Sequence, residues 1–202
     1  GIHKMTLFIL VLTAIVLGLI YWYFSTNNHL VRLQEEYKNA FAQIDVQLKR
    51  RYDLIPNLVN TVKAYLKHES ETLIQVATAR NSALAALQAF KSNIGDEASA
   101  VAMQQANANL NSALKSLSIQ IESYPDLKAN ENISRMQEEL TSTENKISFA
   151  RQAYNDCVTD FNIYRKSFPN SIVASARGFT KDASLLQFED QAEITKAPKV
   201  EF

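Results

Sequence analysis

An uncharged run of twenty residues, from Met5 to Phe24, constrains this chain more than any other feature. At about 1.5 Å per residue, a helix of that length is roughly 30 Å long, which matches the hydrocarbon core of a bilayer. The run closes on Tyr21, Trp22 and Tyr23, aromatic residues typical of a membrane interface, and not on the small residues of a signal-peptide cleavage site. The sequence therefore predicts a short tail at 1–4 and a retained transmembrane helix over 5–24 that contacts the lipid bilayer. A buried helix of a soluble core is the disfavoured alternative, because such helices are shorter and carry a polar face.

The composition of the remainder favours one helical domain. Four glycines and four prolines among 202 residues are too few for many strands joined by tight turns. The 21 basic and 21 acidic residues balance, so no overall positive field recruits nucleic acid, and we expect none as a partner. Cys157 is the single cysteine, so an internal disulfide is excluded.

Apolar residues recur at helical spacing over three stretches, and these predict helices over about 29–92, kinked near Pro56, over 97–122 and over 131–167. Gly95 and Asp96 supply a helix stop and a new N-cap. The third stretch carries a seam from Ile133 to Phe168 in steps of three and four, as in a coiled coil. Short connections require antiparallel helices. We therefore predict an all-α fold: a transmembrane helix, an elongated antiparallel bundle within 25–168, and a partly ordered segment at 169–202.

Residue types that commonly act as metal ligands or nucleophiles do not cluster in the sequence. The three histidines, His3, His29 and His68, lie apart from any metal-binding spacing, and Cys157 lies on the apolar seam, which suits a small buried side chain. We expect no catalytic residue, no metal ligand and no cofactor, and hence no enzyme. The Asn and Gln residues of 104–111 could contact a neighbouring subunit, but they are interpreted as a face open to water.

Each of two clusters of polar residues has two possible interpretations. The basic cluster 49–51 could bind lipid headgroups, but a continuous helix carries it beyond a Debye length from the membrane, so pairing with carboxylates in the bundle is favoured. The second cluster lies near the third seam and consists of Glu144, Asn145, Arg151, Asn155 and Asn162. A buried polar ladder that fixes helix register is favoured for them over a catalytic set.

Several segments together resemble the LemA family: 50–59, 124–130, 143–145, 150–155 and the end of the chain at 197–202. The resemblance implies a bacterial, membrane-anchored helical bundle with no established enzymatic activity and no known cofactor, and some members are encoded beside membrane zinc metalloproteases. The residues that match family motifs are interpreted as structural, serving kink, turn, cap and charge pairing: Arg50, Arg51, Asp53, Pro56, Asn57, Tyr124, Pro125, Asp126, Asn130, Glu144, Asn145, Arg151 and Asn155.

These features predict a single-pass protein of the bacterial inner membrane. Its expected role is that of a non-enzymatic scaffold, a homo-oligomer or an organiser of membrane partners. An accessory subunit or substrate adaptor of a membrane zinc metalloprotease is the alternative. The side of the soluble domain stays open, because the positive charges on the two sides of the span nearly balance under the positive-inside rule: Lys4 and the amino terminus before it, Arg32 and Lys38 after it.

Overall fold

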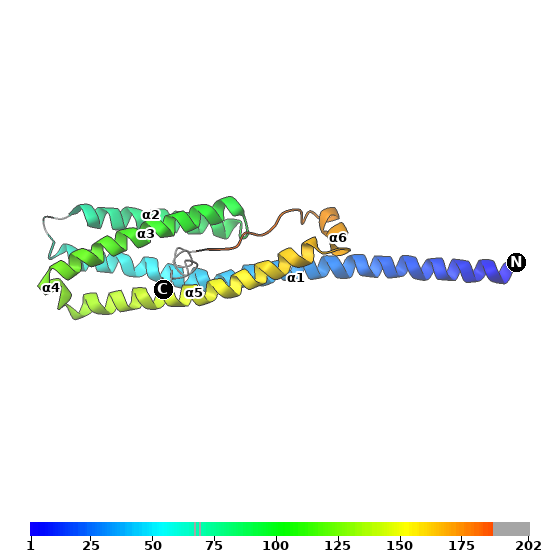
Figure 1. The fold of residues 1–202 in the computed structure, drawn as a ribbon, viewed down its shortest axis with the longest axis horizontal. Helices are drawn as coiled ribbons and strands as arrows, with labels where there is room; N and C mark the ends of the chain where they lie inside the picture. The colour runs from blue at the N-terminus through cyan, green and yellow to red at the C-terminus, as the bar shows by residue number, and fades with distance from the viewer. Residues whose placement is uncertain (67, 69, 188–202) are drawn as a thin grey trace, which may run out of the picture.

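The computed structural model describes residues 1–66, 68 and 70–187, and among these it contains helices and no strands. The helices are α1 (Ile2–Lys63), α2 (Ser70–Ser92), α3 (Glu97–Ser123), α4 (Pro125–Lys128), α5 (Glu131–Lys166) and α6 (Asn170–Ala176). Figure 1 shows an elongated bundle of α1, α2, α3 and α5, from which the first part of α1 projects alone. The predicted all-α fold, an apolar N-terminal helix followed by a helical bundle, is confirmed.

The 62-residue helix α1 joins the apolar run to the bundle without an interruption. Residues 2–4 of the expected tail belong to this helix, which begins at Ile2. No side chain from 1 to 25 is buried, whereas Thr26, Asn27 and Leu30 are. The apolar run is thus a candidate membrane span, and it continues into the bundle as one helix.

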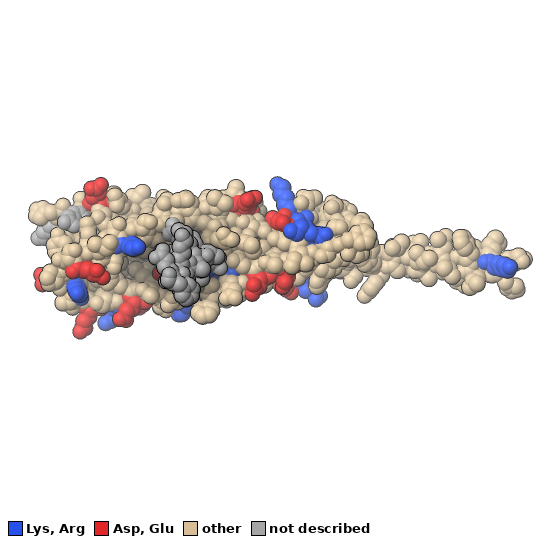
Figure 2. All heavy atoms as spheres, in the orientation of Figure 1, with Lys and Arg blue, Asp and Glu red and all other residues tan. Residues whose placement is uncertain are grey.

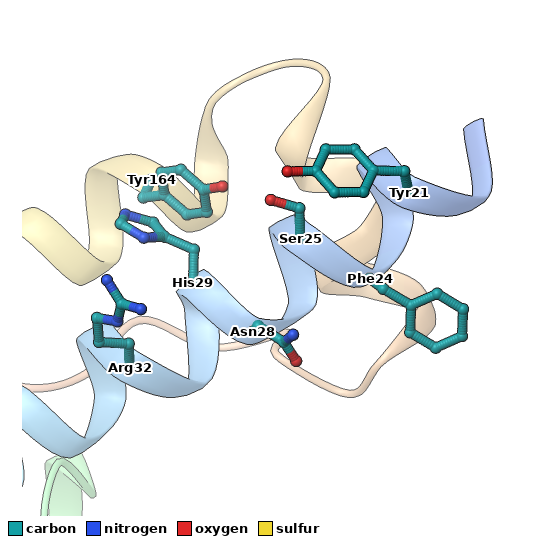
Figure 3. A pocket seen from close by; sticks show the side chains of 7 residues that line it. All are labelled: Tyr21, Phe24, Ser25, Asn28, His29, Arg32 and Tyr164. Atoms are coloured by element: carbon teal, nitrogen blue, oxygen red, sulfur yellow. The ribbon is translucent and has the colours of Figure 1, made fainter. Parts of the chain in front are cut away.

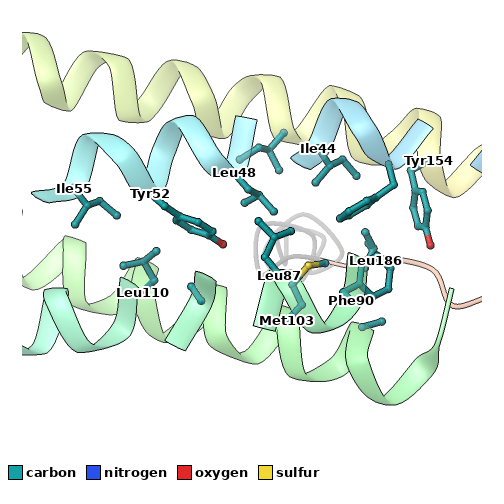
Figure 4. Close-up of a cluster of buried hydrophobic side chains, with 14 of the residues drawn as sticks. Ile44, Leu48, Tyr52, Ile55, Leu87, Phe90, Met103, Leu110, Tyr154 and Leu186 are labelled. Carbon is teal, nitrogen blue, oxygen red and sulfur yellow. The ribbon is translucent and has the colours of Figure 1, made fainter. Parts of the chain in front are cut away.

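The bundle consists of two helix pairs around one hydrophobic core. Helix α5 packs along α1, α2 packs along α3, and α1 also contacts α2. Large side chains at helical spacing on α1, from Leu30 to Val62, are almost fully buried between the pairs. Figure 4 shows the centre of this core, where Leu48 and Tyr52 of α1 face Leu87 of α2 and Leu110 of α3.

The prediction of one helix over 29–92 is wrong, because the chain reverses between Lys63 and Ser70 and not near Pro56. Pro56 lies inside α1. A proline has no amide hydrogen, so it leaves the carbonyl of Tyr52, four residues earlier, without its intrahelical donor. Arg80 of α2 replaces that donor, with Nε 3.0 Å from the Tyr52 oxygen. The replacement lets the helix continue through the proline.

The predicted start of α3 and the predicted apolar seam of α5 can be compared with the structure. Gly95 has a φ of 98°, and the Asp96 side chain accepts from the Ser99 amide at 2.9 Å, so the predicted stop and N-cap are confirmed. The α5 seam buries Ile133, Tyr154 and Phe161. Phe168 does not belong to it, because α5 ends at Lys166 and the Phe168 side chain is 82% exposed.

The segment predicted as partly ordered, 169–202, lies only partly within the described residues. It forms α6 and then an extended stretch to residue 187 that runs back along α5. Residues 188–202 lie outside the described part of the chain.

Candidate functional site

A concave pocket of about 560 Å³ lies where α1 leaves the bundle, and α1 and α5 both line it. Its lining residues are Tyr21, Phe24, Ser25, Asn28, His29 and Arg32 of α1 and Tyr164 of α5. Figure 3 shows the His29 ring beside Tyr164, with Arg32 on the next turn of α1 and Tyr21 at the opposite end. The two rings lie 4.4 Å apart and meet edge to face, which fixes the imidazole against the bundle.

Helix α6 packs on α1 at the same level. Its Val173 and Ala174 are buried, and Arg177, just beyond its end, donates from Nε to Asn27 Oδ1 at 3.0 Å. The short helix thus fastens the C-terminal part of the described chain to α1 three residues past Phe24, at the end of the apolar run. The predicted interface residues border this region: Tyr21 is 76% exposed, and Trp22 and Tyr23 are half-buried.

Charge is unevenly distributed at this end. We call residues 21–34 and 163–181 together the junction surface; they contain five basic residues, Arg32, Arg165, Lys166, Arg177 and Lys181, and no Asp or Glu. Asp182 lies just outside and pairs with Arg165 and, at 3.1 Å, with Lys166, which lowers the pKa of its carboxyl. In Figure 2 the visible face between this basic group and the projecting helix shows no Asp or Glu.

A second polar region lies inside the bundle and brings together three residues that the sequence singled out. Arg51 and Arg151 are 6% and 7% exposed, and with Glu144 they line a small cavity of about 20 Å³. Arg51 donates from Nη2 to Asn111 Oδ1 of α3. The cavity adjoins a groove of about 660 Å³ between α3 and α5 that Arg51 and Glu144 also line.

Two α3 side chains of this polar region, Asn107 and Asn111, were not identified from the sequence. The Tyr52 hydroxyl donates to Asn107 Oδ1 at 2.7 Å, and Asn107 in turn donates to the Met103 carbonyl at 2.9 Å. Burial raises the pKa of Tyr52 to about 12. The interpretation of 104–111 as a face open to water is therefore wrong for Asn107, which is 2% exposed. Asn107 follows Met103 by four residues, so helical spacing places it on the apolar face, and this spacing could have predicted its burial.

The expected polar ladder exists in a different form, because it joins α5 to an extended segment and not to another helix. Asn155 donates to the Leu186 carbonyl and accepts from the Leu186 amide, both at 2.8 Å. Asn162 binds Ala183 in the same way, at 3.0 and 2.8 Å. Seven helical residues and three extended residues each span about 10 Å, so the two pairs stay in register. Asn145, the other asparagine of the predicted ladder, is exposed.

The remaining predicted residues serve local structure. Arg50 lies 3.7 Å from Glu139, so this member of the basic cluster 49–51 pairs with a bundle carboxylate. Asp53 and Asn57 are exposed. Tyr124, Pro125 and Asp126 form the start of α4. Asn130 caps α5 by accepting from the amides of Asn132 and Ile133.

Candidate metal ligands do not cluster in the described part of the chain. No group of three or more His, Cys, Asp or Glu side chains there could hold a metal ion. Burial raises the pKa of the Cys157 thiol, and Glu36, Asp160 and Asp156 raise it further, which disfavours the thiolate.

The fold and the junction together define a class: a helical bundle carried on one apolar N-terminal helix, which is a candidate membrane anchor. Within that class the chain belongs to the LemA family, whose model matches residues 40–202. The chain is also similar to Protein LemA of Metamycoplasma hominis, with 28% identity over 176 residues that cover 86% of this chain and 74% of the relative.

Proposed function

We propose that this LemA-family protein is a non-enzymatic membrane scaffold that holds its bundle at a fixed height over the bilayer and binds further copies of itself or other membrane proteins there. The observation that carries the proposal is the continuity of α1 from Ile2 to Lys63. A flexible linker would leave the bundle free to change its height and tilt. A continuous helix instead sets the direction of the bundle from that of the span, so neighbouring molecules in one membrane hold their bundles at the same height, side by side.

The long sides of the bundle supply the contact surface. The groove between α3 and α5 has leucines at its base, Leu58, Leu114 and Leu140 among them, and polar residues such as Ser112 and Thr141 at its rims. A groove that offers leucines beside polar and charged side chains suits an amphipathic helix or an extended segment of a partner. The groove runs along the bundle, so a partner bound in it would lie beside the rod.

The proposal is tested on the full chain in native membranes. A photoreactive amino acid at Thr141, an exposed position on the rim of the groove, should crosslink to a second copy or to another membrane protein. The matched control is the same amino acid at Gln152, exposed on α5 and not among the groove-lining residues.

Sedimentation velocity of the protein in mild detergent gives the second measurement. A dimer or larger species supports the scaffold. A membrane zinc metalloprotease recovered from the Thr141 position would assign the accessory-subunit role instead. A strict monomer whose Thr141 and Gln152 variants crosslink equally little would refute both roles.

A further inference from the structure

If the apolar run spans a bilayer, the part of the junction surface up to His29 lies at the height of lipid headgroups. Headgroups occupy about 5–8 Å on each side of the hydrocarbon core. With Phe24 at the edge of that core, a rise of about 1.5 Å per residue puts His29 about 8 Å and Arg32 about 12 Å beyond it. Helical side chains tilt toward the N-terminus of their helix, so the long Arg32 side chain leans back toward the membrane.

The pocket in this surface offers hydrogen-bond donors and no carboxylate. Arg32 brings a guanidinium, Asn28 an amide and His29 an imidazole, while Ser25, Tyr21 and Tyr164 bring hydroxyls. Guanidinium groups bind phosphate oxygens with two parallel hydrogen bonds. Tyr21 and Phe24 line the side of the pocket nearest the apolar run, where acyl chains would begin. Hydrogen-bond donors suit the headgroup of a phospholipid, and the aromatic rings on the side next to the apolar run suit the start of its acyl chains.

The connection between α5 and α6 supplies a second, independent observation. Phe168 is 82% exposed and Ile172 is 56% exposed, although both belong to the end of the bundle that faces the apolar run. Figure 3 shows the turn after α5 arching beside Tyr21. Helix α6 is fastened to Asn27, only about 5 Å past Phe24 along α1. Large apolar side chains at that height are suited to the bilayer interface.

We propose that the junction surface binds an anionic phospholipid of the bilayer that holds the anchor, with its phosphate between Arg32 and His29, and that Phe168 and Ile172 enter the interface beside it. Arg32, in a pocket lined by no acidic residue, accounts for the preference for an anionic lipid. The inference rests on the membrane anchoring in the proposed function and adds the ligand of the site.

The first test measures lipid retention by native mass spectrometry of the full chain, with phosphatidylglycerol or phosphatidylcholine added in detergent. Arg32→Gln should weaken phosphatidylglycerol binding at least fivefold and leave phosphatidylcholine binding unchanged. Arg50→Gln is the control, since Arg50 is an exposed arginine on the same helix, about 27 Å further from the membrane. Equal loss, or no loss, in the two variants would overturn the headgroup site.

The second test separates this inference from the anchoring itself, with the full chain in nanodiscs that contain brominated lipids. Trp22 is the single tryptophan, so its quenching reports whether the anchor enters the bilayer. Phe168→Trp in a Trp22→Phe background should also be quenched. Phe149→Trp in the same background should not, because Phe149 is equally exposed but lies further along α5 from the junction.

The outcomes are distinguishable. Unquenched Trp22 would reject the anchor and the proposed function with it. Quenched Trp22, together with a residue 168 signal no stronger than that of residue 149, would overturn only the lipid contact of the α5–α6 turn.

Discussion

The proline inside α1 leads to a prediction that couples two helices. Arg80 donates to the carbonyl that Pro56 leaves without an intrahelical partner, so removing the guanidinium should cost more when proline is present than when it is absent. The perturbation is a double-mutant cycle of Arg80→Met and Pro56→Ala. Methionine keeps much of the volume of the side chain and removes the donor.

The magnitude follows from the hydrogen bond and its exposure. A hydrogen bond from a charged donor contributes about 1.5–3 kcal/mol, and the lower end applies because Arg80 is half-buried. With Pro56→Ala the alanine amide binds the Tyr52 carbonyl, so the cost of Arg80→Met should fall to about 0.5 kcal/mol. The coupling free energy is therefore about 1 kcal/mol. Pro56→Ala alone should raise stability, because an interior proline costs about 3 kcal/mol relative to alanine.

Thermal unfolding of the full chain in detergent, followed by far-UV circular dichroism, measures the cycle. For a chain of this size 1 kcal/mol corresponds to about 2–4 °C in Tm. Arg80→Met should lower Tm by about 3–6 °C with Pro56 present and by about 1–2 °C in the Pro56→Ala background. Arg50→Met, at an exposed position, is the control and should cost the same in both backgrounds. An Arg80→Met effect of equal size with and without the proline would refute the reasoning.

Three further predictions concern other contacts. Asn155→Ala should speed hydrogen exchange of the Leu186 amide at least tenfold, and that of the Ala183 amide less, because Ala183 is held by Asn162; equal acceleration would contradict two separate clamps. Burial raises the Tyr52 pKa to about 12, so the fold favours the neutral phenol. The stability that this preference contributes is complete below about pH 10, the pKa of an unfolded tyrosine, and is lost as pH rises toward 12. Tyr52→Phe should therefore flatten that part of a plot of unfolding free energy, from chemical denaturation, against pH. An unchanged slope would contradict the assignment. Gly95→Ala should lower Tm more than Gly178→Ala. Both glycines have positive φ, but a Cβ at Gly95 would lie 3.1 Å from the Tyr37 hydroxyl, whereas one at Gly178 would meet nothing within 4 Å. Equal losses of Tm would show that backbone conformation alone matters.

The parts of the fold that local chemistry encodes could be predicted from the sequence. The apolar run, the stop and cap at Gly95 and Asp96, and the seam of α5 depend on residues within a few turns of one another. The course of α1 through Pro56 could not be predicted, because the compensating donor, Arg80, is 24 residues away on another helix.

The candidate site was harder to predict for the same reason. The membrane-interface aromatics and Arg32 could be placed near the end of the apolar run, but Tyr164 and α6 reach that level only through the return of α5 along α1. The binding of Ala183 and Leu186 to α5 leaves no periodicity in the sequence, since the partners are side chains on α5 and backbone groups in an extended segment. Contacts of this kind depend on the assembled bundle.

If the apolar run spans a bilayer as proposed, the unbroken course of α1 also makes the molecule a lever. From Phe24 to Lys63 the helix rises about 58 Å, so the tip of the bundle moves whenever the span changes its tilt. Spans tilt more in thin bilayers, and a change of about 10° would carry the tip sideways by about 10 Å. A protein anchored in this way would convert bilayer thickness into lateral displacement far from the lipid, and any partner bound along the bundle would follow that displacement without touching the membrane.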